Sequence, residues 1–346
     1  MSERKMATVR RIDKIVPIAN ADAIELAFVG GWQCVVKKGE FKEGDLVVYC
    51  EVDSVIPNSI APFLSKGKEP RAYNGVKGEK LRSIKLRGTL SQGLILPFDI
   101  LTVEYDGNSG IGDWKDGDDV SQELNIQKYE PPLPAQLTGQ AKGNFPTWIP
   151  KTDQERIQNL SSELADWQQR EMSFEITEKL EGSSMTVYHN NGDIGVCSRN
   201  IDLKDTEGNA FWQVAHSESL IEKLSSLGRN LALQGELVGP GIQGNIYKLA
   251  NPEFRLFDIF DIDKQEYLAY TERMKITDAL DIKNVPVLHE AYPLDYFDTI
   301  REILDMAEGK SKLYETEREG IVFKCIEFPS ISFKAISNKY LLGQKD

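Results

Sequence analysis

The chain has 346 residues, a length that favours two domains over one, and 40% of them are hydrophobic, enough for ordinary globular cores. No apolar run approaches the roughly 20 residues of a bilayer-spanning helix, and the N-terminus lacks the apolar core of a secretory signal, so we expect a soluble cytosolic or nuclear protein that is not secreted. The formal net charge of −13 argues against a uniformly basic nucleic-acid-binding protein.

The charge is distributed unevenly along the chain. From Lys66 to Arg87 there are eight basic residues against two acidic ones, whereas residues 104–123 are mainly acidic. The basic cluster indicates either a local surface that holds nucleic acid or an ordinary solvated loop, and both interpretations stay open.

The cysteines and histidines are too scattered to suggest a metal centre. Their spacings match neither a zinc-binding pattern nor a Ser-His-Asp triad, so we expect reduced, buried thiols. These residues are Cys34, Cys50, Cys197, Cys325, His189, His216 and His289.

The first 130 residues have the pattern of short strands, rich in β-branched and aromatic residues and separated by Gly, Asn, Asp and Pro. This pattern predicts a small antiparallel barrel. An OB-fold is the first candidate because it is small and often binds nucleic acid, while an SH3-like barrel would show the same pattern. The clearest predicted strands are 7–12, 32–36, 45–50 and 93–96.

A connector rich in proline and glycine follows these strands. Prolines stiffen the backbone and remove hydrogen-bond donors, so we expect a linker that is not part of a sheet. The expected organisation is an OB-like domain at 1–135, the linker at 136–150 and a second domain at 151–346.

The second domain alternates helices with strands, which predicts an α+β fold with mostly antiparallel strands. A helix is expected from Asp153 to about Arg170, with Thr152 or Asp153 as its N-cap. The pair Asn191-Gly192 predicts a hairpin turn. The predicted strands are 174–179, 185–189, 194–198, 231–236, 254–260, 320–324 and 331–334, and the other predicted helices are 218–227, 271–280 and 296–307.

One lysine stands where a nucleophile could act. Lys179 ends a predicted strand, and Glu181 and Gly182 follow at once. Such a lysine is a nucleophile if burial or neighbouring cations lower its pKa, and a glycine here would let the backbone approach a phosphate. Alone, the pattern is weak, since lysines often end strands before turns.

Further functional side chains follow at or beside the later strands. Two cations could hold a phosphate, two carboxylates could serve Mg²⁺ or ribose hydroxyls, and one aromatic ring could face a base. ATP-dependent phosphoryl chemistry needs this set. These residues are Arg199 and Lys334, Glu236 and Glu319, and Phe257.

The order of these elements resembles the covalent nucleotidyltransferase superfamily of DNA ligases, RNA ligases and mRNA capping enzymes. Its signature runs KxDG, a downstream arginine, a strand glutamate, an aromatic residue, EGxVxK and a C-terminal lysine, and the resemblance covers residues 151–339. An OB-like domain in front looks like the RNA ligase family with an N-terminal OB module. The resemblance implies an OB-like β-barrel followed by a nucleotidyltransferase (ATP-grasp-like) domain with antiparallel sheets and flanking helices.

The resemblance also implies roles around the lysine. Lys179 would attack the α-phosphorus of ATP, Lys334 would hold the α-phosphate, and Glu319 would support a metal ion. Lys324, in the same motif as Glu319, would touch phosphate. A second lysine usually follows two residues after the one matched by Lys334, but Ile336 stands there, so which lysine fills that position stays open.

The other implied residues bind the nucleotide. Glu181, at a position where the family has aspartate, and Glu236 would contact the ribose or hold the waters of Mg²⁺ or Mn²⁺. Phe257 would stack on adenine. Arg199 would place the nucleotide or the RNA end, and Arg156, on the preceding helix, would bind the phosphate end.

The implied activity is ATP-dependent joining of RNA 3′-OH and 5′-phosphate ends through lysyl-AMP and RNA-adenylate intermediates, with Mg²⁺ or Mn²⁺. The alternatives are a DNA ligase, a capping-type nucleotidyltransferase, or a non-catalytic protein that binds nucleotide or nucleic acid. RNA is the expected partner, no membrane contact is expected, and no surface for a protein partner stands out.

Overall fold

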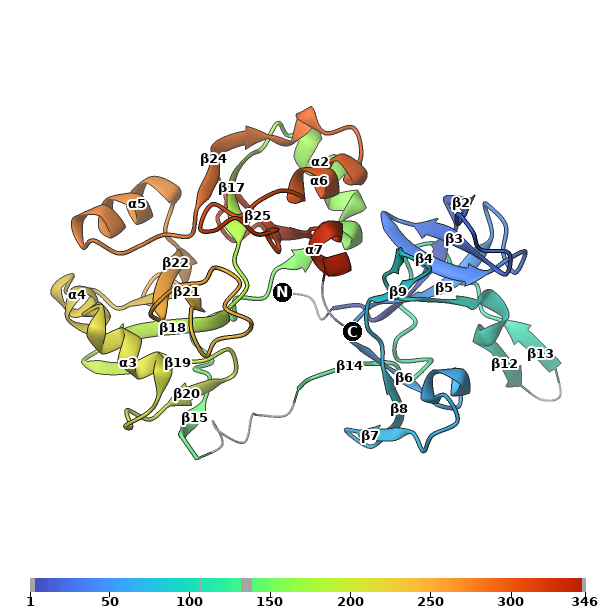
Figure 1. Cartoon of the computed structure of the whole chain (residues 1–346), viewed down its shortest axis with the longest axis horizontal. Coiled ribbons are helices and arrows are strands. Elements are labelled where there is room, and N and C mark those ends of the chain that lie inside the picture. The colour runs from blue at the N-terminus through green and yellow to red at the C-terminus, as the bar shows by residue number, and fades with distance from the viewer. Residues whose placement is uncertain (1–3, 106–107, 132–138, 344–346) are drawn as a thin grey trace. The chain divides into compact units, whose positions relative to one another are not determined.

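The computed structural model describes residues 4–105, 108–131 and 139–343 (Figure 1). The chain divides into two compact units: the first is Met1–Pro132 with Leu341–Asp346, and the second is Leu133–Tyr340. The domain boundary expected at residue 135 lies among residues 132–138, outside the described ones, and stays a prediction. No helix in the described ranges is long and apolar enough to cross a bilayer.

The first unit is built from short antiparallel strands, and the four clearest predicted strands are all present. One three-stranded sheet has the order β1 (Ala7–Arg11), β5 (Leu46–Cys50), β11 (Leu94–Pro97), and another the order β2 (Lys14–Pro17), β3 (Ile24–Val29), β4 (Trp32–Lys37). A four-stranded sheet has the order β14 (Gln127–Lys128), β6 (Ser54–Pro57), β8 (Val76–Lys80), β7 (Arg71–Tyr73). The described part of the first unit also contains two separate strand pairs, β9 (Ile84–Leu86) with β10 (Thr89–Ser91) and β12 (Thr102–Tyr105) with β13 (Asn108–Ile111). Two short 3-10 helices, η1 (Pro62–Ser65) and η2 (Phe98–Leu101), lie between its strands.

Strand β5 connects the two apolar cores of this unit. Val48 and Cys50 belong to one core, whereas Val47 and Tyr49 belong to the other. Because side chains alternate across a strand, β5 is buried on both faces. This double burial explains why its sequence is a continuous apolar run.

The second unit contains two larger sheets. The seven-stranded sheet has the order β15 (Ala141–Asn144), β20 (Ile201–Leu203), β19 (Asp193–Cys197), β18 (Ser183–Asn190), β21 (Leu231–Val238), β22 (Glu253–Asp261), β23 (Glu266–Tyr267). The five-stranded sheet has the order β16 (Glu155–Arg156), β26 (Ser332–Ile336), β25 (Gly320–Cys325), β17 (Ser173–Lys179), β24 (Val287–Pro293). All pairings are antiparallel except that of β16 with β26.

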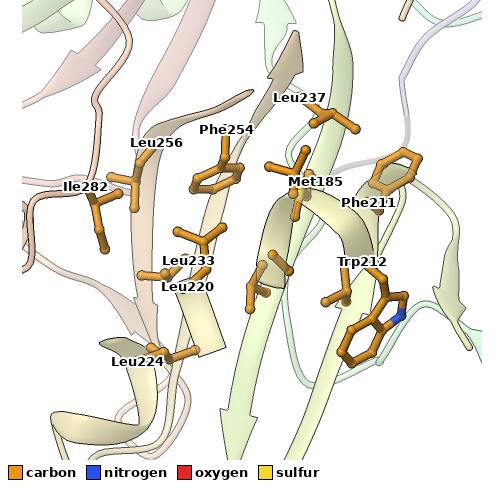
Figure 2. Packing of buried hydrophobic residues seen from close by; sticks show 14 of the residues in the cluster. Met185, Phe211, Trp212, Leu220, Leu224, Leu233, Leu237, Phe254, Leu256 and Ile282 are labelled. Carbon is orange, nitrogen blue, oxygen red and sulfur yellow. The ribbon is translucent and has the colours of Figure 1, made fainter. Parts of the chain in front are cut away.

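Helices cover one face of the seven-stranded sheet and bury an apolar core. Helices α3 (Ala210–Ser217) and α4 (Leu220–Ser226) supply one side of this core. Figure 2 shows Met185 and Phe254 of the sheet gathered with Leu220 and Leu224 of α4. Helix α5 (Tyr270–Ala279) adds Ile276 at the margin.

The five-stranded sheet packs an aromatic core against α2 (Ser161–Gln169) and α6 (Ile300–Ala307). The rings of Phe323 and Phe333 stack with their centroids 4.6 Å apart, and Trp167 of α2 stacks on Phe333 at 5.5 Å. The described part of the second unit also contains the short helices η3 (Ile157–Asn159) and η4 (Leu294–Tyr296), and helix α7 (Asn338–Gly343) begins at its end. The opposite face of this sheet is left for polar side chains.

The helix expected from Asp153 to Arg170 was placed too early, because it begins only at Ser161. Residues 155–156 form β16 instead, where parallel pairing with β26 satisfies their backbone groups. The two expected N-caps are used elsewhere: Thr152 bonds the Ser184 hydroxyl at 2.9 Å, and Asp153 pairs with an arginine. Arg156 therefore lies on a strand and not on a helix.

The expectation that the connector stays outside any sheet is wrong for residues 141–144. They form β15, which pairs with β20 at the edge of the seven-stranded sheet. Just after it, Phe145 and Ile149 are buried against Tyr188. This apolar anchoring outweighs the local glycines, and the register shift between Ala141 and Gly143 accommodates one of them. The predicted hairpin of β18 and β19, by contrast, is confirmed.

We expect Phe333→Ala to lower the free energy of unfolding by about 3–5 kcal/mol, because it leaves a cavity between two stacked rings. Denaturant unfolding measures this change. The matched control is Phe328→Ala, whose ring is 48% exposed and whose loss should cost less than about 1 kcal/mol. Equal losses for the two variants would contradict the aromatic core.

Candidate active site

The polar face of the five-stranded sheet carries the lysine at the end of β17. Lys179 pairs in register with Gly320 of β25, and its amine contacts the Glu319 carboxylate at 2.6 Å. A side chain at position 320 would collide with the Ala335 carbonyl of β26, so the glycine allows this close pairing. The register therefore sets a carboxylate against the predicted nucleophile.

The seven-stranded sheet contributes Glu236 from β21. It lies on the side of the sheet opposite the helix-covered core, in register with Ser184 of β18. Burial raises the pKa of Glu236 to about 8, Lys179 opposes that shift, and Glu319 adds to it. These three groups therefore lie close enough to act on one another electrostatically.

The charge state of Lys179 differs from that of a lysine whose pKa has been lowered to make it a nucleophile. Burial works to lower its pKa, but the carboxylates of Glu319 and Glu236 outweigh burial and raise the pKa above its ordinary value. Arg156 opposes this only in part. The amine is thus an ammonium at neutral pH, and it becomes nucleophilic only when these carboxylates are neutralised.

The turn after Lys179 is tightly packed. Gly182 was expected to let the backbone approach a phosphate, but a side chain there would already collide with the Leu237 carbonyl. The backbone N–H of Glu181 donates to the Tyr247 hydroxyl at 2.6 Å. The Glu181 carboxylate accepts from the Tyr340 hydroxyl at 2.5 Å and from the Gly244 N–H at 3.4 Å.

Tyr247 and Tyr340 were missed by sequence reasoning. Each tyrosine belongs to no motif, and a tyrosine between strands usually signals packing. The glycine-rich stretch 239–244 follows β21 and contains no P-loop motif, because no Lys-Ser/Thr pair follows its glycines, yet its last residue donates to Glu181. No pattern in the sequence links these segments.

Three cations converge from separate elements. Arg156 of β16 lies in register beside Lys334 of β26. Arg199 pairs with Asp153 at 2.8 Å and is half exposed, and its charge lowers the pKa of Glu236. Cations of this kind can hold phosphate oxygens.

Phe257 is the extra residue of a β-bulge. Gln234 pairs with Asp258 and the following Gly235 with Leu256, so Phe257 has no partner across the ladder. Bulges change the direction of a side chain, and Phe257 is half-buried against the cluster that contains Leu180. Its ring thus leaves the helix-covered core and lies beside the turn that follows Lys179.

Lys324 lies in a buried group of four charges. It forms an ion pair with Asp258 and stands opposite Glu175, which Arg273 of α5 binds at 2.5 Å. Burial lowers the pKa of Lys324. Four strand residues, or roughly 13 Å, separate it from the level of Lys179. The predicted contact of Lys324 with phosphate stays a prediction.

Lys339, the next lysine after Lys334, forms an ion pair at the surface. Lys339 contacts Glu308 at 2.8 Å, and its side chain is 63% exposed. Ile336 is buried in the sheet. Lys334 is therefore the lysine that β26 presents beside Arg156. Among the described residues, no group of three or more His, Cys, Asp or Glu side chains is arranged to hold a metal ion.

Two family profiles match parts of the chain. The profile of a family described as RNA ligase matches residues 172–336, and that of an OB-fold domain family matches residues 6–98. A comparison with curated protein sequences found no match.

Solved structures of Naegleria gruberi RNA ligase resemble the whole chain. A mutant with AMP and Mn is 47% identical, with 99% of each chain covered and a TM-score of 0.84. The enzyme with PPi is 48% identical, with 98% of each chain covered and a TM-score of 0.83. A mutant with ATP and Mn is 46% identical, with 98% of this chain and 99% of that chain covered and a TM-score of 0.83.

We expect Glu236→Gln to change how stability depends on pH. Since the pKa of Glu236 is raised from 4.5 to about 8, the folded chain between these values keeps a proton that the unfolded chain has released. The stability of the wild type therefore falls across this range as pH rises. Glutamine releases no proton, so the variant should gain stability relative to the wild type from about pH 5 to about pH 8.

Thermal unfolding in the presence of a chelator measures this difference. The control is Glu207→Gln, at an exposed position outside the site. If the Glu236→Gln and wild-type midpoints ran parallel across the pH range, the buried, proton-retaining state of Glu236 would be wrong.

Proposed function

This chain belongs to the RNA ligase family, and we propose that it joins a 3′-OH end of RNA to a 5′-phosphate end, using ATP. The observation that carries the proposal is the contact of Lys179 with Glu319, beside Glu236, at the facing ends of paired strands. The wider activity, ATP-dependent RNA ligation through a nucleotidyl intermediate, is that of the family.

The first step forms a bond between Lys179 and AMP. The Nζ atom attacks the α-phosphorus of ATP, the P–O bond to pyrophosphate breaks, and pyrophosphate leaves. Before attack the ammonium must lose a proton, and Glu319 already accepts a hydrogen bond from it at 2.6 Å. Lys334, beside Arg156, supplies positive charge where negative charge develops on the α-phosphate.

The carboxylates suit a divalent cation. The raised pKa of Glu236 reflects a partly buried acid whose charge is incompletely balanced, and carboxylate oxygens are ligands for Mg²⁺ and Mn²⁺. Because no three of the described carboxylates are arranged to coordinate an ion together, Glu236, Glu319 and Glu181 would hold such an ion through its bound waters. When bound, it supplies charge that neutralises phosphate oxygens and cancels the hold of the carboxylates on the Lys179 proton.

The nucleotide would lie between the bulge and the turn. Phe257 offers a half-buried ring for adenine, and Glu181 and Glu236 offer acceptors for ribose hydroxyls. Arg199, whose exposed side chain reaches Asp153, is free to reposition toward a phosphate or an RNA end. Lys324 would contact phosphate from a position farther along β25.

Two further transfers complete the reaction. The 5′-phosphate of RNA attacks the phosphorus of the lysyl-AMP, the N–P bond breaks, and Lys179 is regenerated. A 3′-OH then attacks the RNA 5′-phosphorus of the RNA-adenylate, and AMP leaves. Each transfer uses the same phosphate-holding cations, because the charge develops on the same kind of oxygen.

The first unit offers a surface for RNA on the β9–β10 hairpin. Within the ranges that the structure describes, Arg82, Lys85 and Arg87 are exposed and have no ion-pair partner, whereas Lys77 and Lys80 of the basic cluster are paired with carboxylates. Arg87 and Gly88 form the turn with φ values of 49° and 81°. Ile84 and Leu86 are exposed between these cations. Cations with apolar side chains between them suit a single strand, by contacts to phosphates and to bases.

We expect Lys179→Ala to abolish covalent labelling by ATP that carries a labelled α-phosphate. The wild type should form an acid-labile, alkali-stable adduct with Mg²⁺ or Mn²⁺. The control Lys275→Ala, an exposed lysine of α5, should label like the wild type. Absence of any adduct with ATP or GTP, from protein free of bound AMP, would contradict the proposal.

The same reaction tests the RNA ends. Joining should require a 5′-phosphate and a 3′-OH, and substrates with 5′-OH or 3′-phosphate should stay unjoined. Matched strands with ribose or deoxyribose ends separate an RNA ligase from a DNA ligase. Label from GTP in place of ATP would indicate capping-type chemistry.

We expect the triple variant Arg82→Ser, Lys85→Ser, Arg87→Ser to weaken end joining while leaving lysyl-AMP formation unchanged. If all three cations contact phosphates, the slope of log affinity for single-stranded RNA against log salt should fall by about 2. The control replaces three exposed lysines of the same unit, Lys37, Lys38 and Lys42, by serine. An unchanged slope in the first variant, or equal changes in both, would show that the hairpin does not hold RNA.

A further inference from the structure

Helix α7 brings a tyrosine hydroxyl into the carboxylate cluster. The Tyr340 hydroxyl donates to Glu181 Oε2 at 2.5 Å, a distance typical of a charge-assisted hydrogen bond. The ring is held by its own backbone, because the Tyr340 N–H donates to the Ser337 hydroxyl at 3.1 Å, as in an N-cap. The Ser337 N–H donates in turn to the Glu319 carbonyl at 2.9 Å.

This chain of contacts ties the helix to the catalytic strands. Ser337 directly follows β26, the strand of Lys334, and Glu319 directly precedes β25. Ser337 is fully buried, so the start of α7 cannot shift without disturbing both strands. The position of the Tyr340 hydroxyl is therefore set by the same sheet that sets Lys179.

Glu181 is restrained from the other side as well. Its second carboxylate oxygen accepts from the Gly244 N–H at 3.4 Å, and its own N–H donates to the buried Tyr247 hydroxyl at 2.6 Å. Two segments that are distant from Glu181 in sequence, the loop of Gly244 and Tyr247 and the helix of Tyr340, thus hold one residue. Ordering a free glutamate side chain costs about 1.5–2 kcal/mol of rotamer entropy. These hydrogen bonds offset that cost, so the Glu181 carboxylate stays in one position.

The restraint matters because Glu181 lies two residues from Lys179. The Glu319 carboxylate already contacts that amine and favours its ammonium form. The Glu181 carboxylate on a flexible arm would bind the ammonium too and would no longer face the nucleotide. The Tyr340 hydroxyl, which donates to the Glu181 carboxylate, keeps that carboxylate away from the Lys179 amine.

We propose that Tyr340 is a positioning residue for lysyl-AMP formation: its hydroxyl fixes the Glu181 carboxylate, and helix α7 is thereby part of the active site. The proposal rests on the proposed function of Lys179 and Glu181. It adds a residue of α7 that touches no reacting atom. Tyr247 has a different task, because it anchors the backbone of Glu181 and not the carboxylate.

The test is Tyr340→Phe, which removes one hydroxyl and keeps the ring. We expect single-turnover lysyl-AMP formation at saturating ATP to slow about tenfold, the factor that corresponds to about 1.4 kcal/mol and to the loss of one charge-assisted hydrogen bond. The KM for ATP and the thermal midpoint should stay at their wild-type values, since the ring and the sheet are intact. Tyr296→Phe, whose ring is 68% exposed on η4, is the matched control and should behave like the wild type.

A double-mutant cycle shows whether the tyrosine acts through the carboxylate. In the Glu181→Ala background, Tyr340→Phe should change the rate less than about twofold, because nothing remains for the hydroxyl to hold. A full tenfold loss in that background would overturn the proposal. So would a loss in Tyr340→Phe that is matched by a fall in thermal midpoint, which would indicate a purely structural role.

The result for the wild type separates the two levels of inference. If wild-type protein forms no adduct, the proposed function fails and this inference fails with it. If the wild type forms the adduct and Tyr340→Phe forms it equally fast, the proposed function stands and the role of Tyr340 is refuted.

Discussion

The pairing register between β17 and β25 is the constraint on which the candidate site depends. It sets Lys179 opposite Gly320, so the carboxylate of the preceding Glu319 meets the amine. A slip of one residue would turn Lys179 into the aromatic core and Phe174 out of it, because side chains alternate along a strand. The stacked rings on the apolar face therefore hold the catalytic groups in place without touching them.

Charge balance is the second theme of the site. The resting amine is held as an ammonium by its carboxylates, so activation must come from positive charge that arrives with the substrate. Farther along the same sheet face, Lys324 with Asp258 and Arg273 with Glu175 form ion pairs that are already complete. Arg273 also donates to the Phe257 carbonyl. Buried pairs of this kind are expensive to desolvate, and here they join the strand of Lys179 to the bulge that presents an aromatic ring.

Sequence patterns predicted the strands that carry Lys179 and Glu236 and the strand that Glu319 precedes, because alternation and motif order are local or nearly local signals. They failed where a tertiary contact overrides local preference. Strand β16 has only two residues, too few for any period, and the connector strand β15 is held by buried anchors beyond it. Tyr340 and the raised pKa of Lys179 depend on groups from several segments, so no window of sequence contains them.

The hydrogen bond between Lys179 and Glu319 joins residues that are 140 positions apart. Contacts of such long range close late in folding, since the entropy of loop closure must be overcome before they form. A partly folded chain with correct local hairpins would still have its lysine without its carboxylate. Only molecules in which β17 and β25 have paired would therefore form the covalent adduct. The rate at which the adduct appears during refolding would report the rate of this long-range strand pairing.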